Sequence, residues 1–379
     1  MSRHVIAKQR RWGAQAWLAA SMAGLSAAAF SRRRRRLSLR GRVAVVTGGA
    51  RGLGLAITRA LLEGGCHVAI CGRDGEVVRR CVDQYRAEGF AISGQACDVS
   101  NPDQVKAFLQ LVVDTHGPVD ILVNNAAQCY VGPAPELDSL DMQLALQNIF
   151  WGQFHTTMAV LPQMRARRFG RIVNITSLGG KLPIPHQAAY VAAKHAATGW
   201  SETLAAELEH EGVVVSTITP PPLRNGAPLH AHYNGQRDRE FTWFANALTS
   251  PLSAISADRV ARAVVQAIVR GQHERAVSPL SWFVARAHGL APNVVGIGLR
   301  WLARRMPPAG GPGLPSTMRL GADVARSSAD TSLLQLARRV ASDEARYLPE
   351  GSAQALAGTA PVVCDGQGTS WPDSAVPSA

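Results

Sequence analysis

From Arg42 onward, short apolar runs alternate with longer amphipathic segments, and this alternation constrains the fold of the 379-residue chain more than any other feature. The short runs, rich in β-branched residues, predict buried parallel strands, and the longer segments predict helices. Together they predict an α/β fold with a doubly wound parallel sheet. The predicted strands are RVAVVTG, HVAICGR, ISGQACDV, DILVNNA, RIVNITS and VVVSTITP, and the predicted helices lie near 53–64, 75–88, 102–116, 138–165, 188–211 and 257–271.

The same pattern divides the chain into four parts. We expect a single domain over residues 41–280, preceded by a basic and apolar leader at 1–40 and followed by an amphipathic, apolar and basic segment at 281–306. Residues 307–379 are rich in Pro, Gly, Ser and Ala, which predicts a mostly disordered tail. Within the domain, residues 223–256 interrupt the alternation with an aromatic, loop-like stretch.

The net charge of +13 is concentrated at the N-terminus, because residues 1–42 hold eleven Lys and Arg and no acidic residue. The rest of the chain is therefore close to +2. A nucleic-acid-binding protein is expected to carry a basic face within its fold, so we expect no nucleic-acid partner. None of the six cysteines forms a Cys-x-x-Cys pair, and we expect free thiols and no metal site.

The leader contains a run of 19 residues without a charge, Trp12–Phe30, with basic residues on both sides. As a helix it would extend about 28 Å, close to the ~30 Å hydrocarbon thickness of a bilayer. A membrane anchor or interfacial helix is the first interpretation, and a disordered or mis-assigned start and a cleaved signal are the others. Arg32–Arg36 argue against export, because such residues stay on the cytoplasmic side. We expect the cytoplasmic face of a membrane, with a soluble cytoplasmic protein as the alternative.

The segment VVTGGARGLGLAI places Gly48, Gly52 and Gly54 between the first predicted strand and the first predicted helix. Glycine permits a tight turn and a close approach of the backbone to a pyrophosphate, and the helix N-terminus offers unpaired N–H groups to the anion. An ordinary turn is the alternative. The flanking strand and helix favour nucleotide binding in a Rossmann-type sheet.

The end of the second predicted strand distinguishes between nicotinamide cofactors. An acidic residue there would bind the ribose 2′-OH of NAD, but the chain has Gly72 and Arg73. Arg51 lies in the glycine loop, and two converging arginines suit a 2′-phosphate. We therefore expect NADP(H) rather than NAD(H), with two solvated surface arginines as the alternative. Asp98, after the third strand, is a candidate adenine ligand or a helix cap.

The stretch TSLGGKLPIPHQAAYVAAK ends in Tyr-x-x-x-Lys, with Ser177 lying 13 residues before Tyr190. Tyr190 and Lys194 are four residues apart, so they share one face of a helix. A lysine ammonium beside a phenol favours the phenolate and lowers the pKa of the phenol. The three residue types at this spacing predict a proton-transfer site.

Together these motifs resemble the short-chain dehydrogenases/reductases over about residues 40–280. TGGARGLG is similar to that family's Thr-Gly-x-x-x-Gly-x-Gly loop, and NNAA is similar to its Asn-Asn-Ala-Gly motif, with Ala127 in place of Gly. The residues that match the family's catalytic tetrad are Asn148, Ser177, Tyr190 and Lys194. The resemblance implies an enzyme that interconverts a carbonyl and an alcohol with a nicotinamide cofactor, in one catalytic domain.

The resemblance also implies a role for each residue. Tyr190 would exchange a proton with the substrate oxygen, and Ser177 would orient that oxygen, so both would bind substrate. Lys194 would lower the pKa of Tyr190 and bind the nicotinamide ribose, and Asn148 would hold a water on a proton path. The implied cofactor-binding residues are Thr47, Gly48, Arg51, Gly52, Leu53, Gly54, Arg73, Asp98, Asn124, Tyr190 and Lys194.

Two further features concern the substrate side. Pro221 stands where the family usually has Gly, and Asn225 falls where it often has a Thr that bonds the carboxamide. The bulk of the aromatic stretch predicts a large apolar substrate, such as a steroid, a retinoid or a lipid-like molecule. Its large residues are Phe241, Trp243, Phe244 and Leu248, and the alternative is that they pack the stretch onto the core.

Other functions and partners stay open at this point. A catalytically silent nucleotide-binding regulator or a membrane scaffold would keep the same fold. An epimerase or dehydratase of the extended branch is a further alternative, although its usual Gly-x-x-Gly-x-x-Gly loop is absent. The family resemblance also implies a homo-oligomer. A helical stripe of Val295, Leu299 and Leu302, with Trp301 beside it, predicts a second interfacial helix.

Overall fold

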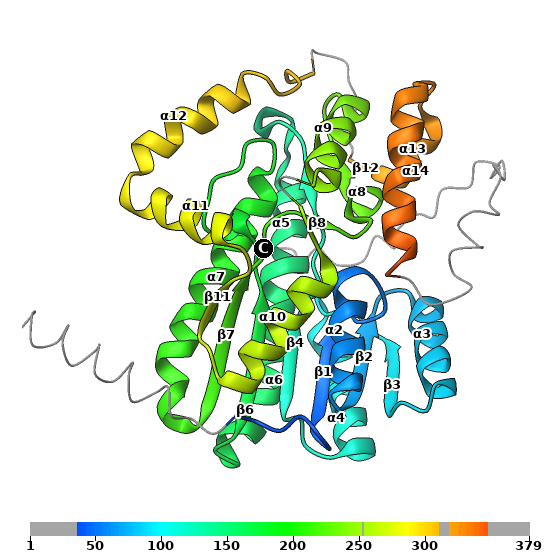
Figure 1. Cartoon of the computed structure of the whole chain (residues 1–379), viewed down its shortest axis with the longest axis vertical. Coiled ribbons are helices and arrows are strands. Elements are labelled where there is room, and N and C mark those ends of the chain that lie inside the picture. Colours follow the sequence, from blue (N-terminus) through cyan, green and yellow to red (C-terminus); the bar gives the residue numbers. More distant parts are fainter. Residues whose placement is uncertain (1–35, 252–253, 311–317, 348–379) are drawn as a thin grey trace, which may run out of the picture.

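The computed structural model describes residues 36–251, 254–310 and 318–347. Its centre is a seven-stranded parallel sheet in the order β11-β7-β6-β4-β1-β2-β3 (Figure 1). The strands are β1 (Val43–Thr47), β2 (His67–Gly72), β3 (Ile92–Ala96), β4 (Ile121–Asn124), β6 (Gly170–Ile175), β7 (Val213–Thr219) and β11 (Glu274–Ala276). The predicted doubly wound parallel sheet and its six strands are confirmed, whereas the short polar edge strand β11 was not predicted.

Helices cover both faces of the sheet, and each face has its own apolar core. One face packs against α2 (Gly52–Glu63), α3 (Gly75–Ala87) and α10 (Ala257–Arg270). The other face packs against α4 (Pro102–His116), α6 (Gly152–Ala166) and α7 (Ala188–Leu208). The central strands are buried on both faces, which is why their sequences are almost continuously apolar.

The predicted long helix near 138–165 contains a local irregularity. It begins as α5 (Ser139–Leu146), continues through a π-helical turn, η2 (Gln147–Trp151), and becomes α6. A π turn widens a helix locally and is frequent at functional sites. Here the turn carries Asn148, one of the four candidate catalytic residues.

The prediction of a loop-like stretch at 223–256 is wrong. This stretch contains β8 (Leu223–Arg224), α8 (Ala227–His230), β9 (His232–Tyr233), the 13-residue helix α9 (Arg237–Thr249) and β10 (Ile255–Ser256). Buried Phe241, Phe244 and Leu248 lie at helical spacing along α9. The polar run Arg237–Glu240 masked that periodicity in the sequence.

The prediction of a mostly disordered tail is wrong for residues 318–347. After β12 (Arg319–Leu320), they form α13 (Gly321–Ser327) and α14 (Thr331–Ala345), which lie beside α8 and α9 in Figure 1. Leu333 and Val340 on α14 are buried in one apolar cluster with side chains of α9. The general composition of the tail concealed this short amphipathic helix. The rest of the predicted tail lies outside the described residues, except for its first positions, 307–310.

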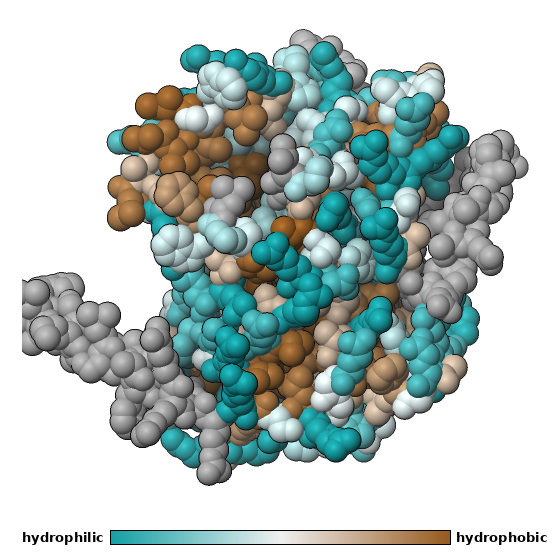
Figure 2. Space-filling model, viewed as in Figure 1, coloured by the Kyte–Doolittle hydropathy of each residue, from teal (hydrophilic) through white to brown (hydrophobic). Residues whose placement is uncertain are grey.

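The predicted amphipathic segment at 281–306 is a pair of helices, α11 (Pro279–Leu290) and α12 (Pro292–Ala303). Its exposed stripe differs from the predicted one, because Val294, Ile297 and Trp301 face outward while Val295 and Leu299 are half-buried. Figure 2 shows this apolar surface over α11 and α12. Among the described residues, no helix is long and apolar enough to cross a membrane. The predicted leader helix at 12–30 lies outside them.

Candidate active site

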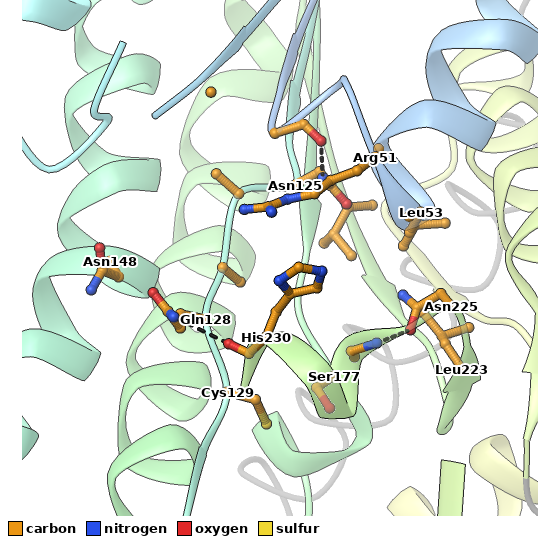
Figure 3. Close-up of a pocket in the computed structure, with 18 of the residues that line it drawn as sticks. Arg51, Leu53, Asn125, Gln128, Cys129, Asn148, Ser177, Leu223, Asn225 and His230 are labelled. Atoms are coloured by element: carbon orange, nitrogen blue, oxygen red, sulfur yellow. Dashed lines mark hydrogen bonds between the residues drawn. The ribbon is translucent and has the colours of Figure 1, made fainter. Parts of the chain in front are cut away.

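A cavity of about 360 Å³ lies at the carboxyl ends of the parallel strands, where open α/β sheets bind their ligands. Its walls come from the glycine loop after β1, the segments that follow β2, β4, β6 and β7, and the first turns of α7. Figure 3 shows side chains from these separate segments around one space. The fold therefore gathers residues that are more than a hundred positions apart in the sequence.

The glycine loop brings its backbone to the cavity surface. Gly48 and Gly52 have left-handed φ angles of 62° and 56°, which favour glycine. A Cβ atom on Gly54 would lie 1.9 Å from the carbonyl oxygen of Gly48, so a side chain does not fit there. All three glycines line the cavity together with Arg51 and Leu53. This cradle fits the diphosphate of a dinucleotide.

Two predicted cofactor residues have structural roles instead. The hydroxyl of Thr47 accepts hydrogen bonds from the N–H groups of Asn125 and Ala126, at 2.9 and 3.0 Å. The amide of Asn124 is buried and donates to Asn174, so it joins β4 to β6. Neither Thr47 nor Asn124 lines the cavity, whereas Asn125 does. Successive side chains point in opposite directions at the end of a strand, which explains why Asn125 lines the cavity and Asn124 does not.

The two arginines predicted to select the cofactor both line the cavity. Arg73 donates to the side chain of Gln128 at 2.7 Å. Burial lowers the pKa of Arg51, and the neighbouring charge of Arg73 contributes to that fall. Asp98 also lines the cavity, and its carboxylate accepts hydrogen bonds from the N–H and hydroxyl of Ser100. Asn101, not Asp98, caps α4.

The structure brings Ser177, Tyr190 and Lys194 together. Ser177 follows β6, and its hydroxyl hydrogen-bonds the phenol of Tyr190 on α7. Lys194, one turn further along α7, donates from Nζ to the carbonyl oxygen of Ile175 at 2.9 Å. The ammonium nitrogen lies 5.7 Å from the centre of the Tyr190 ring. All three residues line the cavity.

Burial dominates the electrostatics of these groups. It raises the pKa of the Tyr190 phenol, the nearby Cys129 adds to the rise, and the hydrogen bond with Ser177 opposes it. Burial also lowers the pKa of Lys194 to about 8, against a smaller opposing effect of Cys129. The predicted net lowering of the Tyr190 pKa by the ammonium is therefore wrong for this arrangement. Near neutral pH the phenol is protonated and Lys194 is mainly an ammonium.

Asn148 lines the cavity, on a part of the wall that is separate from Ser177 (Figure 3). Its side-chain amide donates to the hydroxyl of Tyr130 at 2.8 Å and to the carbonyl oxygen of Leu144 at 2.9 Å. No direct hydrogen bond joins it to Lys194 among the interactions of the described residues. The predicted water-mediated path between them stays a prediction.

The aromatic residues of α9 divide into two groups. Phe244 and Leu248 line the cavity, so the prediction that they face a substrate space is consistent with their position. Phe241 is fully buried in the cluster beneath α9 and α14, and it packs against Tyr233. Trp243 donates to Glu240 and is half-buried outside the cavity. For Phe241 and Trp243, the alternative of packing holds.

The segment after β7 forms another wall. Pro220, Pro221 and Pro222 all line the cavity, so Pro221 occupies the wall where the family usually has glycine. Asn225 also faces the cavity, and its side-chain oxygen accepts from the N–H of Ala227 at 3.3 Å. The side-chain amide nitrogen of Asn225 lies close to the glycine loop. A Cβ added to Gly52 would lie 3.6 Å from this nitrogen.

Several cavity residues were not predicted from the sequence: Gln128, Cys129, Ile184, His230 and Glu344. Each lies outside a recognisable motif, and Glu344 belongs to the segment expected to be disordered. Burial raises the pKa of the Cys129 thiol to about 12, so this thiol is protonated near neutral pH. Within the part of the chain that the structure describes, no group of three His, Cys, Asp or Glu residues is placed to hold a metal ion.

Comparison with known proteins identifies the family of this chain. The short chain dehydrogenase family matches residues 42–233. The chain is 36% identical over 190 residues to dehydrogenase/reductase SDR family member 7C of Bos taurus, which covers 48% of this chain and 61% of that protein. It is also similar to solved structures of two enzymes with nicotinamide cofactors bound.

One of these structures is a variant of actinorhodin polyketide ketoreductase with NADPH, with a TM-score of 0.56 and 30% identity over 62% of this chain and 95% of that chain. The other is a short chain dehydrogenase/reductase from Burkholderia phymatum in complex with NAD, with a TM-score of 0.63 and 25% identity over 68% and 96%. The chain belongs to the short-chain dehydrogenase/reductase family. It is an NAD(P)-dependent oxidoreductase that acts on CH–OH groups and the corresponding carbonyls.

Proposed function

We propose that the enzyme reduces a large apolar carbonyl compound with NADPH, and that Tyr190 is its proton donor. The observation that carries this proposal is the contact of Tyr190 with Ser177 beside the buried Lys194. The raised pKa of the phenol keeps it protonated near neutral pH, and a protonated phenol can donate to a carbonyl oxygen that gains charge. This protonation state supports reduction as the favoured direction.

The residues divide the work between binding and proton transfer. Ser177 orients and polarises the substrate oxygen, and Tyr190 transfers a proton to it. Lys194 holds positive charge behind the phenol and binds the nicotinamide ribose. The glycine loop holds the diphosphate, and the bound cofactor supplies the hydride. Ile175 anchors Lys194 through its carbonyl oxygen, so the ammonium stays at one depth in the site.

The two arginines support NADPH as the cofactor. Arg51 and Arg73 lie at the same end of the cavity, and no acidic residue ends β2. Guanidinium groups bind phosphate through charge-assisted hydrogen bonds, whereas a ribose hydroxyl gains less from them. Solved relatives bind either NADPH or NAD, so the preference depends on these two side chains.

The walls around the catalytic residues support an apolar substrate. Leu178, Ile184, Phe244 and Leu248 all line the cavity. Such a surface favours a steroid, a retinoid or another lipid-like carbonyl over a small polar one. One similar solved structure is of a polyketide ketoreductase, so a ketone is a precedented type of substrate among similar proteins.

An apolar substrate also suits an enzyme at a membrane surface, and we include this location in the proposal. Seven of the twelve exposed large apolar side chains in the described residues lie on the helices α11 and α12. From 275 to 322 the sequence has six arginines and no acidic residue. Exposed apolar groups with basic neighbours are typical of helices that lie in an anionic membrane interface.

The leader and the surface of α11 and α12 would then attach the enzyme at two points. The charge-free run at 12–30 is the first attachment, and Arg32–Arg36 would keep the catalytic domain on the cytoplasmic side. A homo-oligomer, which is common in the family, is compatible with this arrangement. Exposed Trp151 and Met158 on the outer side of η2 and α6 are candidates for that contact.

The first prediction tests the proton donor. Tyr190→Phe keeps the ring and removes the proton, so kcat should fall by at least ~10²-fold while NADPH still binds. The measurement is NADPH oxidation with a panel that runs from small polar carbonyls to steroid and long-chain ketones. In the unchanged protein, the large apolar ketones should have the higher kcat/KM.

Tyr85→Phe is the matched control, because Tyr85 is buried in the core away from the cavity. Turnover by Tyr190→Phe at a rate near that of the control would refute the mechanism. Activity restricted to small polar carbonyls would refute the apolar substrate and leave the mechanism intact.

The second prediction concerns the cofactor. The ratio of kcat/KM for NADPH to that for NADH should exceed about tenfold, since each charge-assisted contact contributes ~1.5–3 kcal/mol. Arg73→Ala should lower this ratio, mainly because it lowers kcat/KM for NADPH. Arg79→Ala, an exposed arginine one turn into α3, should leave the ratio unchanged. Equal or better use of NADH by the unchanged protein would refute the preference.

The third prediction concerns the membrane. A chain that begins at Leu37 should bind vesicles of anionic lipid, and the full chain should bind more tightly. Replacing Ile297 and Trp301 by Ser should weaken binding of the shorter chain at least ~tenfold, since burying each apolar side chain contributes ~1.5–3 kcal/mol. Leu111→Ser, at an exposed position of α4, is the control. The measurement is flotation of the protein with the vesicles. If all variants float with the vesicles to the same extent, α11 and α12 are not the membrane-binding surface.

A further inference from the structure

The C-terminal helix α14 brings an acidic side chain into the cavity. Glu344 lies one residue before the end of α14, is only 3% exposed and lines the cavity with the glycine loop. Its carboxylate is paired with the imidazole of His230 at the end of α8. His230 lines the same cavity, and Figure 3 shows its ring in view between Arg51 and Ser177. Asp74 and Asp98 also line the cavity, but Glu344 comes from the C-terminal helix and lies among donors that suit an anion.

The position of Glu344 is fixed by packing on both sides. Toward the start of α14, Leu333 and Val340 are each 1% exposed beneath α9. Beyond the helix, Tyr347 is buried against α10 and donates from its hydroxyl to Asp258 at 3.1 Å. A Cβ on Gly226 would lie 2.4 Å from the Cβ of Glu344, so the turn between β8 and α8 packs directly against this residue.

The same segment also uses a donor of the glycine loop. The N–H of Gly52, the first residue of α2, donates to the carbonyl oxygen of Tyr347 at 2.9 Å. Burial lowers the pKa of Arg51, and the negative charge of Glu344 opposes that fall, so the carboxylate acts on the guanidinium. A carboxylate and a carbonyl oxygen of one segment thus face the donors of the dinucleotide cradle.

We propose that Glu344 is an affinity-determining residue of the cofactor site, whose negative charge opposes the phosphates of the dinucleotide. The inference deepens the proposed function, because it requires that the cradle binds a nicotinamide dinucleotide. Two negative charges in a cavity of low dielectric repel each other more strongly than in water. Glu344 therefore weakens cofactor binding and speeds cofactor release, which limits turnover in many enzymes.

His230 is part of this arrangement as a positioning residue. Its bond to the Glu344 carboxylate holds the acidic side chain toward the cavity, and its own carbonyl oxygen accepts from Gln128 at 3.2 Å. Gln128 in turn accepts from Arg73. One chain of contacts therefore runs from the C-terminal helix to an arginine proposed to bind the 2′-phosphate. The family match ends at residue 233, so α14 lies outside the matched region.

The test compares dinucleotide binding by the full chain and by Glu344→Gln, which removes the charge and keeps the shape. The variant should bind both NADPH and NADH at least about fivefold more tightly, the lower end of typical coupling between two sites. The gain should lie mainly in a slower dissociation rate. Adenosine, which carries no phosphate, should bind both proteins equally.

Asp343→Asn is the matched control, since it makes the same charge change one position earlier, on a residue that pairs with Arg346 and does not line the cavity. It should leave both affinities within about twofold. Glu344→Met provides a second uncharged variant, with the same expected tightening, if glutamine rearranges the contact with His230. Circular dichroism and melting curves confirm that each variant is folded.

Equal or weaker binding of both dinucleotides by the two folded Glu344 variants would overturn the role of Glu344. A tightening of the same size in Asp343→Asn would also overturn it, because the effect would then come from net charge alone. A preference of the unchanged protein for NADH would overturn the proposed cofactor but not this inference, since the diphosphate is common to both dinucleotides.

Discussion

The active site depends on the burial of one ammonium group, that of Lys194. A buried charge is costly unless it is paired or hydrogen-bonded, and here the carbonyl oxygen of Ile175 accepts from Nζ at 2.9 Å. This bond ties α7 to the end of β6. Because Tyr190 precedes Lys194 by one helical turn, the same bond sets the position of the phenol beside Ser177, which follows β6 directly. One strand end and one helix therefore place all three groups.

Burial then determines the protonation states that the chemistry uses. It raises the pKa of Tyr190 and lowers that of Lys194, so the two pKa values, which are close together in the unfolded chain, move apart. The same burial affects stability, since the unfolded chain binds the Lys194 proton more tightly. The cost of burying this charge is present below about pH 8 and disappears as pH rises toward 10.5. This cost in stability belongs to a group of the candidate active site, where perturbed pKa values are common.

The remainder of the site is closed by segments that the central fold does not require. Helix α9 supplies Phe244 and Leu248, and α14 supplies Glu344. These helices share an apolar core of their own, so the C-terminal segment and the substrate wall stabilise each other. A substitution in this second core is therefore expected to alter both the substrate space and the glycine loop that binds the cofactor.

The sequence predicted the features that repeat or that match a motif. The strand–helix alternation, the glycine loop and the group of Ser177, Tyr190 and Lys194 all follow from local patterns with known spacing. Thr47 and Asn124 were misplaced because a motif identifies a segment, whereas the direction of each side chain depends on the pleat of the strand. Glu344 was missed because its position in the cavity depends on long-range packing of α14, which no local pattern encodes.

The effect of burial on the pKa values of Tyr190 and Lys194 also could not be predicted from the sequence. A lysine four residues after a tyrosine predicts a lowered phenol pKa, but the sequence does not show how deeply the pair is buried. In the structure, desolvation is the largest cause of the pKa shift of both groups. The spacing thus identified the reacting groups, and only the three-dimensional environment determined their charge.

The most direct test of this account is an NMR titration of the lysine side chains. The chain has only four lysines, Lys8, Lys106, Lys181 and Lys194, so a sample labelled at lysine gives few signals, and Lys194→Arg assigns the signal of interest. The account predicts that Lys194 titrates near pH 8 in the protein without cofactor, well below the ordinary lysine pKa of 10.5. A titration of Lys194 near its ordinary value of 10.5 would contradict a buried ammonium as the organising element of the site.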